Sequence, residues 1–150
     1  MKAIEINGEI KTFGSVPKKW SDENGLHLNI GDGSAFGFKD VVYPEIDSRI
    51  QEFGSLKLDG DVYTYDVLDK TFTETLAELK AEKVSQLKSI IGSKLSVTDW
   101  YVIRNADVGT EIPAAIKESR ADLRDQSDIL EAEINALTTK KAVVLFDINL

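Results

Sequence analysis

The sequence has no cysteine, a single histidine and three prolines in 150 residues. Without cysteine, disulfides, thiolate metal sites and cysteine nucleophiles are excluded. The histidine, His27, stands in the middle of an alternating apolar segment, with no hydrolase motif around any serine or threonine. A general base needs a positioned partner and a pocket, and this position predicts neither, so we interpret His27 as an ordinary surface residue. The expectation is a protein without catalytic residues or cofactors.

Basic runs and long apolar runs are also missing. The net charge is −8, with 13 acids against 8 bases in residues 1–70 and 13 against 10 in residues 71–150. Nucleic acid is therefore not an expected partner, because the attraction of basic clusters to phosphates is absent. No stretch reaches the roughly 20 apolar residues of a membrane span, and the alternation over residues 1–5 predicts a strand and not a signal peptide. We expect a soluble protein of the cytosol.

Several smaller patterns carry less specific signals. Asp32 and the Asp59–Asp61 turn lack the spacing of a calcium loop, and no Gly-Lys-Ser/Thr follows the nearby glycines, so no metal or phosphate site is predicted. Aromatic residues on the predicted strands could form a stacking platform for sugars or bases, but packing is the favoured interpretation. These aromatic residues are Trp20, Phe36, Phe38, Tyr43, Tyr63 and Tyr65.

The first half of the chain predicts strands and turns. Asn7-Gly8 indicates a tight hairpin, and the Asp59-Gly60 turn indicates a second one. Residues 26–30 alternate and predict a strand with Leu26, Leu28 and Ile30 facing inward. Residues 36–38 and 41–43 are typical of further strands, and residues 45–53 of a short helical turn closed by Gly54.

The second half changes to helical periodicity. A long helix is predicted over residues 73–91, capped by Thr71 or Thr75 and ended by Gly92. A second helix is predicted over 98–107, capped by Thr98 or Asp99 and stopped near Gly109, and further helices are predicted from Pro113 and after a cap at Ser127-Asp128. Residues 141–148 are ambiguous, and an extended segment is favoured over a helix. The prediction is an α+β fold with a β-rich domain over residues 1–70, a helical domain over 71–150, and the boundary near 69–73.

An apolar stripe on the long helix allows two interpretations. It packs on the rest of this chain, or it makes a coiled-coil contact with a second copy or a partner helix. The spacing is closer to 3.6 than to 3.5 residues, which favours internal packing. As a hypothesis, the stripe and the apolar segment 142–148 bind a partner through the following residues: Leu76, Leu79, Val84, Leu87, Ile91, Val144 and Phe146.

One ordered set of short motifs resembles a known family. Thr98-Asp99-Trp100, then Val102-Ile103-Arg104, Ile112-Pro113 and finally 120–125 (RADLRD) follow one another as in the C-terminal domain of phage tail assembly chaperones. In that family an aromatic residue is usual at positions 116 and 119, where this chain has isoleucine and serine. The likeness extends over about residues 36–125 and is strongest over 95–125. The residues that carry it are Asp99, Trp100, Arg104, Pro113, Arg120, Leu123 and Arg124.

This resemblance implies binding without catalysis. Such a protein binds a tail fibre or another tail protein and aids its folding, trimerisation or attachment, in the host cytoplasm during assembly. Retention in the virion tail, and association of the chain with itself, stay open. From the residues alone, Trp100 is expected to anchor helix against helix, and Asp99 to cap a helix or to pair with Arg120 or Arg124. Such contacts are expected mainly to hold the helical domain together.

Three other functions are weighed after the chaperone. The first is a structural subunit of the tail, such as a connector near the baseplate. The second is a carbohydrate-binding β module on a helical stalk, and the last is an enzyme. The absence of any catalytic constellation places the enzyme behind the other two.

Overall fold

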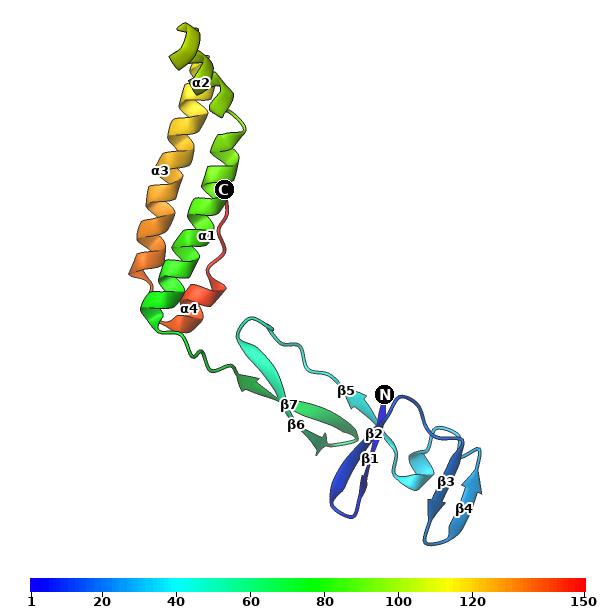
Figure 1. Cartoon of the computed structure of the whole chain (residues 1–150). Coiled ribbons are helices and arrows are strands. Elements are labelled where there is room, and N and C mark those ends of the chain that lie inside the picture. The colour runs from blue at the N-terminus through cyan, green and yellow to red at the C-terminus, as the bar shows by residue number, and fades with distance from the viewer. The chain divides into compact units, whose positions relative to one another are not determined.

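A computed structural model describes all residues, 1–150, and shows an α+β protein (Figure 1). The chain forms two compact units, Met1–Lys70 and Thr71–Leu150, which have the same bounds as the two predicted domains. The first unit contains the strands and the second contains the α-helices. Each unit is described separately below.

A five-stranded sheet forms most of the first unit. Its strands are β1 (Lys2–Ile6), β2 (Glu9–Phe13), β5 (Lys39–Val42), β6 (Gln51–Asp59) and β7 (Val62–Asp69), in the order β2-β1-β5-β7-β6. Only the β5–β7 pair is parallel. A separate hairpin joins β3 (Lys19–Asp22) to β4 (Gly25–Leu28).

Two tight turns set the register of the sheet. Asn7 and Gly8 both have positive φ, 53° and 82°, as the predicted hairpin turn requires, and Ile6 pairs with Glu9 across it. In the second hairpin Asp59 pairs with Val62, so the turn residues are Gly60 and Asp61, one position later than predicted. Gly60, with φ 57°, supplies the conformation that the turn needs.

The predicted strand over residues 26–30 is shorter and faces the other way. Leu26 and Leu28 are mainly exposed, whereas His27 packs against Phe36 with ring centroids 4.7 Å apart. An alternating pattern fixes two faces but not which of them is covered. Here β4 pairs with β3 alone, and the covered face carries His27.

Two other local predictions are wrong. Residues 36–38 form no strand, because η1 (Ser34–Phe36) is a 3₁₀ turn and β5 begins only at Lys39. Residues 45–53 form no helix. They contain a single turn, in which Asp47 O accepts from the amides of Ile50 and Gln51. Strand β6 then begins at Gln51 and carries Gly54 at an irregularity in its pairing with β7.

The core of the first unit is small and rich in aromatic residues. Ala3, Val41 and Tyr63 are buried together on the sheet. Phe38, 2% exposed, makes edge contacts with Phe13 and Trp20, with ring centroids 5.5 and 4.9 Å apart. Most of the six aromatic residues for which the sequence favours packing are therefore buried or half-buried, and Tyr43, at 47% exposure, is the most exposed of them.

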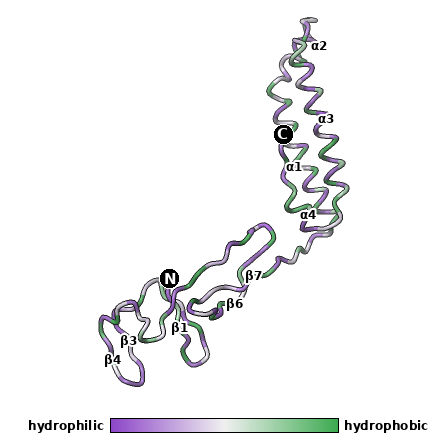
Figure 2. Tube along the Cα trace, turned by 180° about the vertical axis from the view of Figure 1, so that it is seen from behind, coloured by the Kyte–Doolittle hydropathy of each residue, from purple (hydrophilic) through white to green (hydrophobic).

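Four helices form the second unit: α1 (Leu76–Ser96), α2 (Asp99–Val108), α3 (Ala114–Ala136) and α4 (Lys140–Leu145). Thr75 caps α1 in a complete capping box with Glu78, as predicted. Hydrophobic and hydrophilic residues alternate along α1 and α3, as a helix with one covered face requires (Figure 2). No helix combines the length and the apolar character of a membrane crossing.

Three predicted boundaries in the helical unit are wrong. Helix α1 passes through Gly92 to Ser96, since burying Leu95 outweighs the roughly 1 kcal/mol that an interior glycine costs. Helix α3 passes through Ser127 and Asp128, because its apolar period continues without a break on both sides of them. Residues 140–145 are helical, capped by the Thr139 side chain, and only the segment after them is extended.

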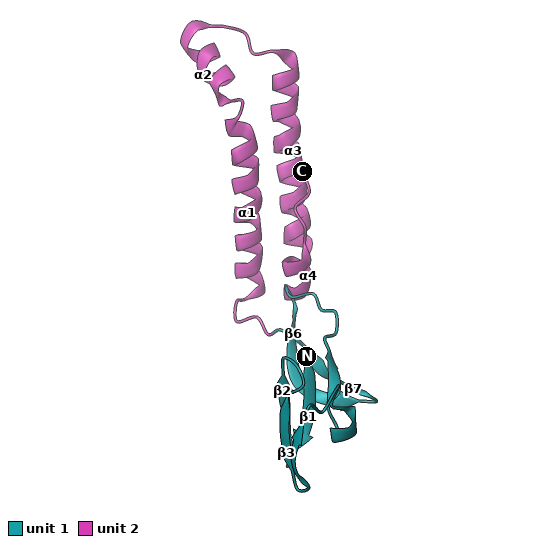
Figure 3. Ribbon diagram, turned by 90° about the vertical axis from the view of Figure 1, so that its right-hand side faces the viewer, with its two compact units in different colours: residues 1–70 teal, residues 71–150 magenta.

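Helices α1 and α3 run antiparallel and side by side (Figure 3). Lys80 Nζ donates to Asn135 O at 2.7 Å, and Lys88 pairs with Glu131 at 2.8 Å, which raises the pKa of Lys88. Between the helices Leu87, Ile91 and Ile134 are buried. The apolar residues packed on this trio come from three segments: Val84, Leu95, Leu123, Leu130, Phe146, Ile148 and Leu150.

The close contact over Gly33 gives a matched test of the first unit. A Cβ at Gly33 would lie 2.8 Å from Phe38 atoms, whereas Gly31, also at positive φ, has open space around it. We expect Gly31→Ala to cost about 1 kcal/mol for the left-handed backbone alone. Gly33→Ala should cost at least about 1 kcal/mol more, since Phe38 must shift. Urea unfolding followed by near-ultraviolet circular dichroism measures both, and equal losses would contradict this packing.

Candidate interaction site

Arg120 joins three helices at the turn of the helical unit. From α3, its Nη1 donates to Leu95 O and to Thr98 Oγ1, both at 2.7 Å, and its Nη2 donates to Asp99 Oδ1 at 2.9 Å. Thr98 and Asp99 stand at the start of α2, and Leu95 lies in the last turn of α1. The predicted pairing of Asp99 with Arg120 is therefore confirmed, and it fixes where α2 begins.

The guanidinium is the polar centre of this junction. Arg120 is 9% exposed and is the buried charged residue of the chain, while the Asp99 side chain remains 51% exposed. A planar guanidinium can serve three acceptors at once, which explains why arginine and not lysine suits the position. Because the Asp99 side chain is half exposed and water screens its charge, Leu95 O and Thr98 Oγ1 account for much of the energy of the hydrogen bonds that Arg120 makes.

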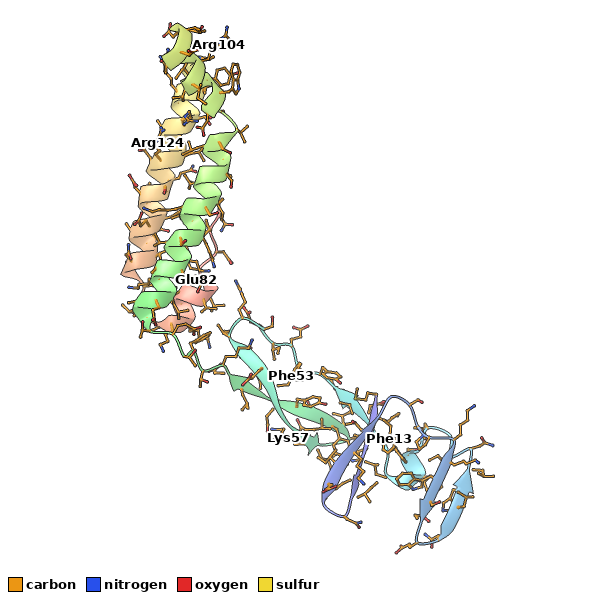
Figure 4. The ribbon with its side chains drawn as sticks, in the orientation of Figure 1. Phe13, Phe53, Lys57, Glu82, Arg104 and Arg124 are labelled. Carbon is orange, nitrogen blue, oxygen red and sulfur yellow. The ribbon has the colours of Figure 1, made fainter.

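The other motif residues on α3 have supporting positions. Pro113 is the residue before the first turn of α3, and Leu123 packs on the buried trio of the helical unit. Arg124 Nη1 donates to Arg120 O at 3.3 Å along the helix and does not pair with Asp99. Figure 4 shows Arg124 on α3, one turn from the junction, and Arg104 on α2.

Trp100 does not anchor helix against helix, contrary to the prediction. It is 50% exposed, and its ring stacks on the neighbouring Tyr101 with centroids 3.8 Å apart. Residues three and four apart share a helix face, so Trp100, Ile103, Arg104 and Asp107 lie together. We call these four residues the α2 face. Ile103 is 66% exposed, so the α2 face displays apolar surface to solvent.

Two further exposed residues extend this apolar surface. Val97, in the link between α1 and α2, is 74% exposed, and Val108, at the end of α2, is 63% exposed. Gly109, with φ 69°, ends the helix, as predicted. Tryptophan and arginine are among the residue types that dominate the energy of protein interfaces, and Ile103 adds exposed apolar area beside them.

The residues predicted to bind a partner through the long helix are used inside the unit instead. Leu87 and Ile91 are buried, and Val84 and Phe146 pack on them. Leu76, Leu79 and Val144 are half-buried. The stripe on α1 and the apolar segment after residue 140 cover each other, so neither is free in this conformation.

Outside the α2 face, the candidate chemical groups are occupied by local contacts. His27 Nε2 lies 2.9 Å from Asp22 Oδ1, and this contact lowers the pKa of the Asp22 carboxyl. Asp32 accepts from the amide and the hydroxyl of Ser34, which lower its pKa. No group of three or more metal-ligating side chains comes together.

No family model, curated protein or solved structure matches the chain. The fold and the site define an α+β protein whose helical unit is an antiparallel pair, with a helix that exposes Trp100 and Ile103 at the turn between the two long helices.

Two partners of Arg120 were not foreseen from the sequence. Thr98 was expected to cap α2, but its hydroxyl accepts from Arg120 and donates to Leu95 O at 3.1 Å. Leu95 contributes its backbone carbonyl, which no residue-type pattern can indicate. The one available signal in the sequence was the spacing that puts Arg120 on the same helix face as Ile116 and Leu123, since a charge on a covered face must find several acceptors.

The junction is tested by Arg120→Met, which keeps an unbranched, flexible apolar stem and removes the guanidinium with its charge. The variant leaves Leu95 O and Thr98 Oγ1 without their donor, and we expect the helical unit to lose about 2 kcal/mol. Arg104→Met, on the exposed face of α2, is the control and should change stability by less than about 0.5 kcal/mol. Urea unfolding at 222 nm measures both, and similar losses for the two would refute the role of Arg120.

Proposed function

We propose that the chain is a phage tail-fibre assembly chaperone that binds a tail fibre or another tail protein through the α2 face. Two observations support this. The ordered motifs over residues 98–125 resemble those of the chaperone family. The same motifs contain Trp100 and Ile103, which are exposed and not used to build the helical unit.

The proposed mechanism is binding without turnover. A folding fibre exposes apolar surface and unpaired strand edges, which aggregate unless they are covered. The α2 face offers an apolar patch of its own, and Arg120 holds it in a defined position on the helical pair. The acidic chain, with a net charge of −8, stays soluble while it displays that patch and favours a basic region on its partner.

The test is co-expression with a tail-fibre protein from the same genome. We expect the fibre to be soluble and trimeric with the chain, to copurify with it before assembly is complete, and to aggregate without it. Trp100→Ala and Ile103→Ser should each weaken binding at least about ten-fold, since exposed anchors of this kind contribute 2 kcal/mol or more. Ile129→Ser is the matched control, because Ile129 is 59% exposed on α3, away from the α2 face.

Different outcomes separate this proposal from its alternatives. A fibre that is equally soluble and trimeric without the chain contradicts the chaperone. Peptides of the chain at a fixed copy number in purified virions would instead indicate a structural subunit of the tail. Equal binding by the Ile103→Ser and Ile129→Ser variants would contradict the α2 face as the binding surface.

A further inference from the structure

Residues 146–150 form an extended segment that lies on the helical pair, and we call it the strap. Phe146, Ile148 and Leu150 pack on the buried trio Leu87, Ile91 and Ile134. Asp147 and Asn149, the residues between them, are exposed. The strap therefore has the alternation of a strand with one covered face, although it is seated on helices and not in a sheet.

The strap's backbone is held by two lysines of α1. Lys83 Nζ donates to Phe146 O at 3.2 Å, and Lys94 Nζ donates to Leu150 O at 3.0 Å. Eleven helical residues span about 16 Å. Four extended residues span about 13 Å, a difference that flexible lysine side chains accommodate. The two lysines thus match the length of a short extended peptide, and Lys83 binds a backbone carbonyl of the kind that any peptide has.

The strap is seated less deeply than the helix before it. Val143 of α4 is 1% exposed, whereas the three apolar residues of the strap are half-buried. Beside the strap α1 and α4 border a hollow of about 170 Å³. The hollow is lined by Leu79, Glu82, Lys83, Gln86, Val143 and Val144. The part of α1 around residues 79–86, next to the end of the strap that Lys83 holds, is therefore not fully covered.

We propose that this groove binds an extended apolar segment of another polypeptide, and that the strap is an intramolecular competitor which covers the groove until such a segment arrives. This rests on the proposed function, and it names the class of segment bound: an unpaired strand with large apolar residues at alternate positions. Such a segment offers the same side-chain spacing as the strap and a free backbone carbonyl for Lys83. Because the strap competes for the groove, the apparent affinity for such a segment is the intrinsic affinity multiplied by the fraction of molecules in which the groove is open.

The test uses a fluorescein-labelled peptide with the sequence of residues 145–150 and measures its anisotropy with the full chain. The double variant Phe146→Ser/Ile148→Ser releases the strap, and we expect it to bind the peptide at least about ten-fold more tightly than the unchanged chain does. Adding Lys83→Ala to that variant should weaken binding several-fold. Adding Lys88→Ala, whose ammonium pairs with Glu131 and not with the strap, should leave binding unchanged.

Two controls keep the result interpretable. A peptide with serine in place of its phenylalanine and isoleucine should not bind. Circular dichroism shows whether the double variant keeps its helices, and if it does not, the milder Ile148→Ala, which retains Phe146, carries the comparison. A folded variant that binds the peptide no better than the unchanged chain overturns the proposal, as does binding that ignores the serine substitutions.

The peptide assay contains no fibre, so the two proposals fail separately. If the peptide does not bind but the fibre needs the chain for solubility, the groove proposal is wrong and the chaperone proposal is supported. If the peptide binds but the fibre is equally soluble and trimeric without the chain, the chaperone proposal is wrong and the groove remains as a peptide-binding site.

Discussion

The helical unit depends on the burial of one apolar stripe of α1 against α3. Leu87 and Ile134 lose all contact with water there, and two fully buried side chains of this size contribute on the order of 4 kcal/mol. The antiparallel register that this packing sets brings Lys80 to Asn135, Lys88 to Glu131 and the last turn of α1 to Arg120. Everything proposed for the turn and for the groove follows from that register.

Because the stripe is covered, the surface offered to a partner has to be elsewhere. Helix α2 connects the two long helices and is held at its first turn by the guanidinium of Arg120. Its exposed side carries Trp100 and Ile103 without any contact from the rest of the unit that buries them. The motif residues thus divide into those that hold the junction and those that face solvent, and the second kind suit recognition.

The groove under the strap is a second proposed binding surface, which a partner reaches only when the strap leaves it. The strap completes the apolar core, but it does so with half-buried side chains and with lysine contacts that another peptide can replace. Segments with few buried contacts are the ones that open at the lowest free energy. The same residues can therefore stabilise the isolated chain and yield to a partner.

Local signals in the sequence were reliable where a few neighbouring residues decide the outcome. The Asn7-Gly8 turn and the end of α2 at Gly109 follow from backbone preferences, and the capping box of Thr75 and Glu78 follows from hydrogen bonds between residues three apart. Predictions failed where distant residues decide. The helix passes Gly92 because Leu95 finds a core, and no local pattern shows that core.

The candidate site shows the same division. The Asp99–Arg120 pair could be predicted from charge and spacing, whereas the carbonyl of Leu95 could not. Trp100 was expected to be buried because it is the largest apolar residue of its half, but it lies on the outer side of α2. The size of an apolar side chain predicts how much free energy its burial would contribute, but not whether the side chain points towards the core.

The central claim is that this chain acts by covering part of another polypeptide through α2. Amide hydrogen exchange of the chain, alone and with the tail-fibre protein proposed as its partner, tests this most directly. The account predicts slower exchange over residues 97–108 in the complex and little change on the outer side of α3 around Ile129. Unchanged exchange over 97–108 in a complex that demonstrably forms would contradict it.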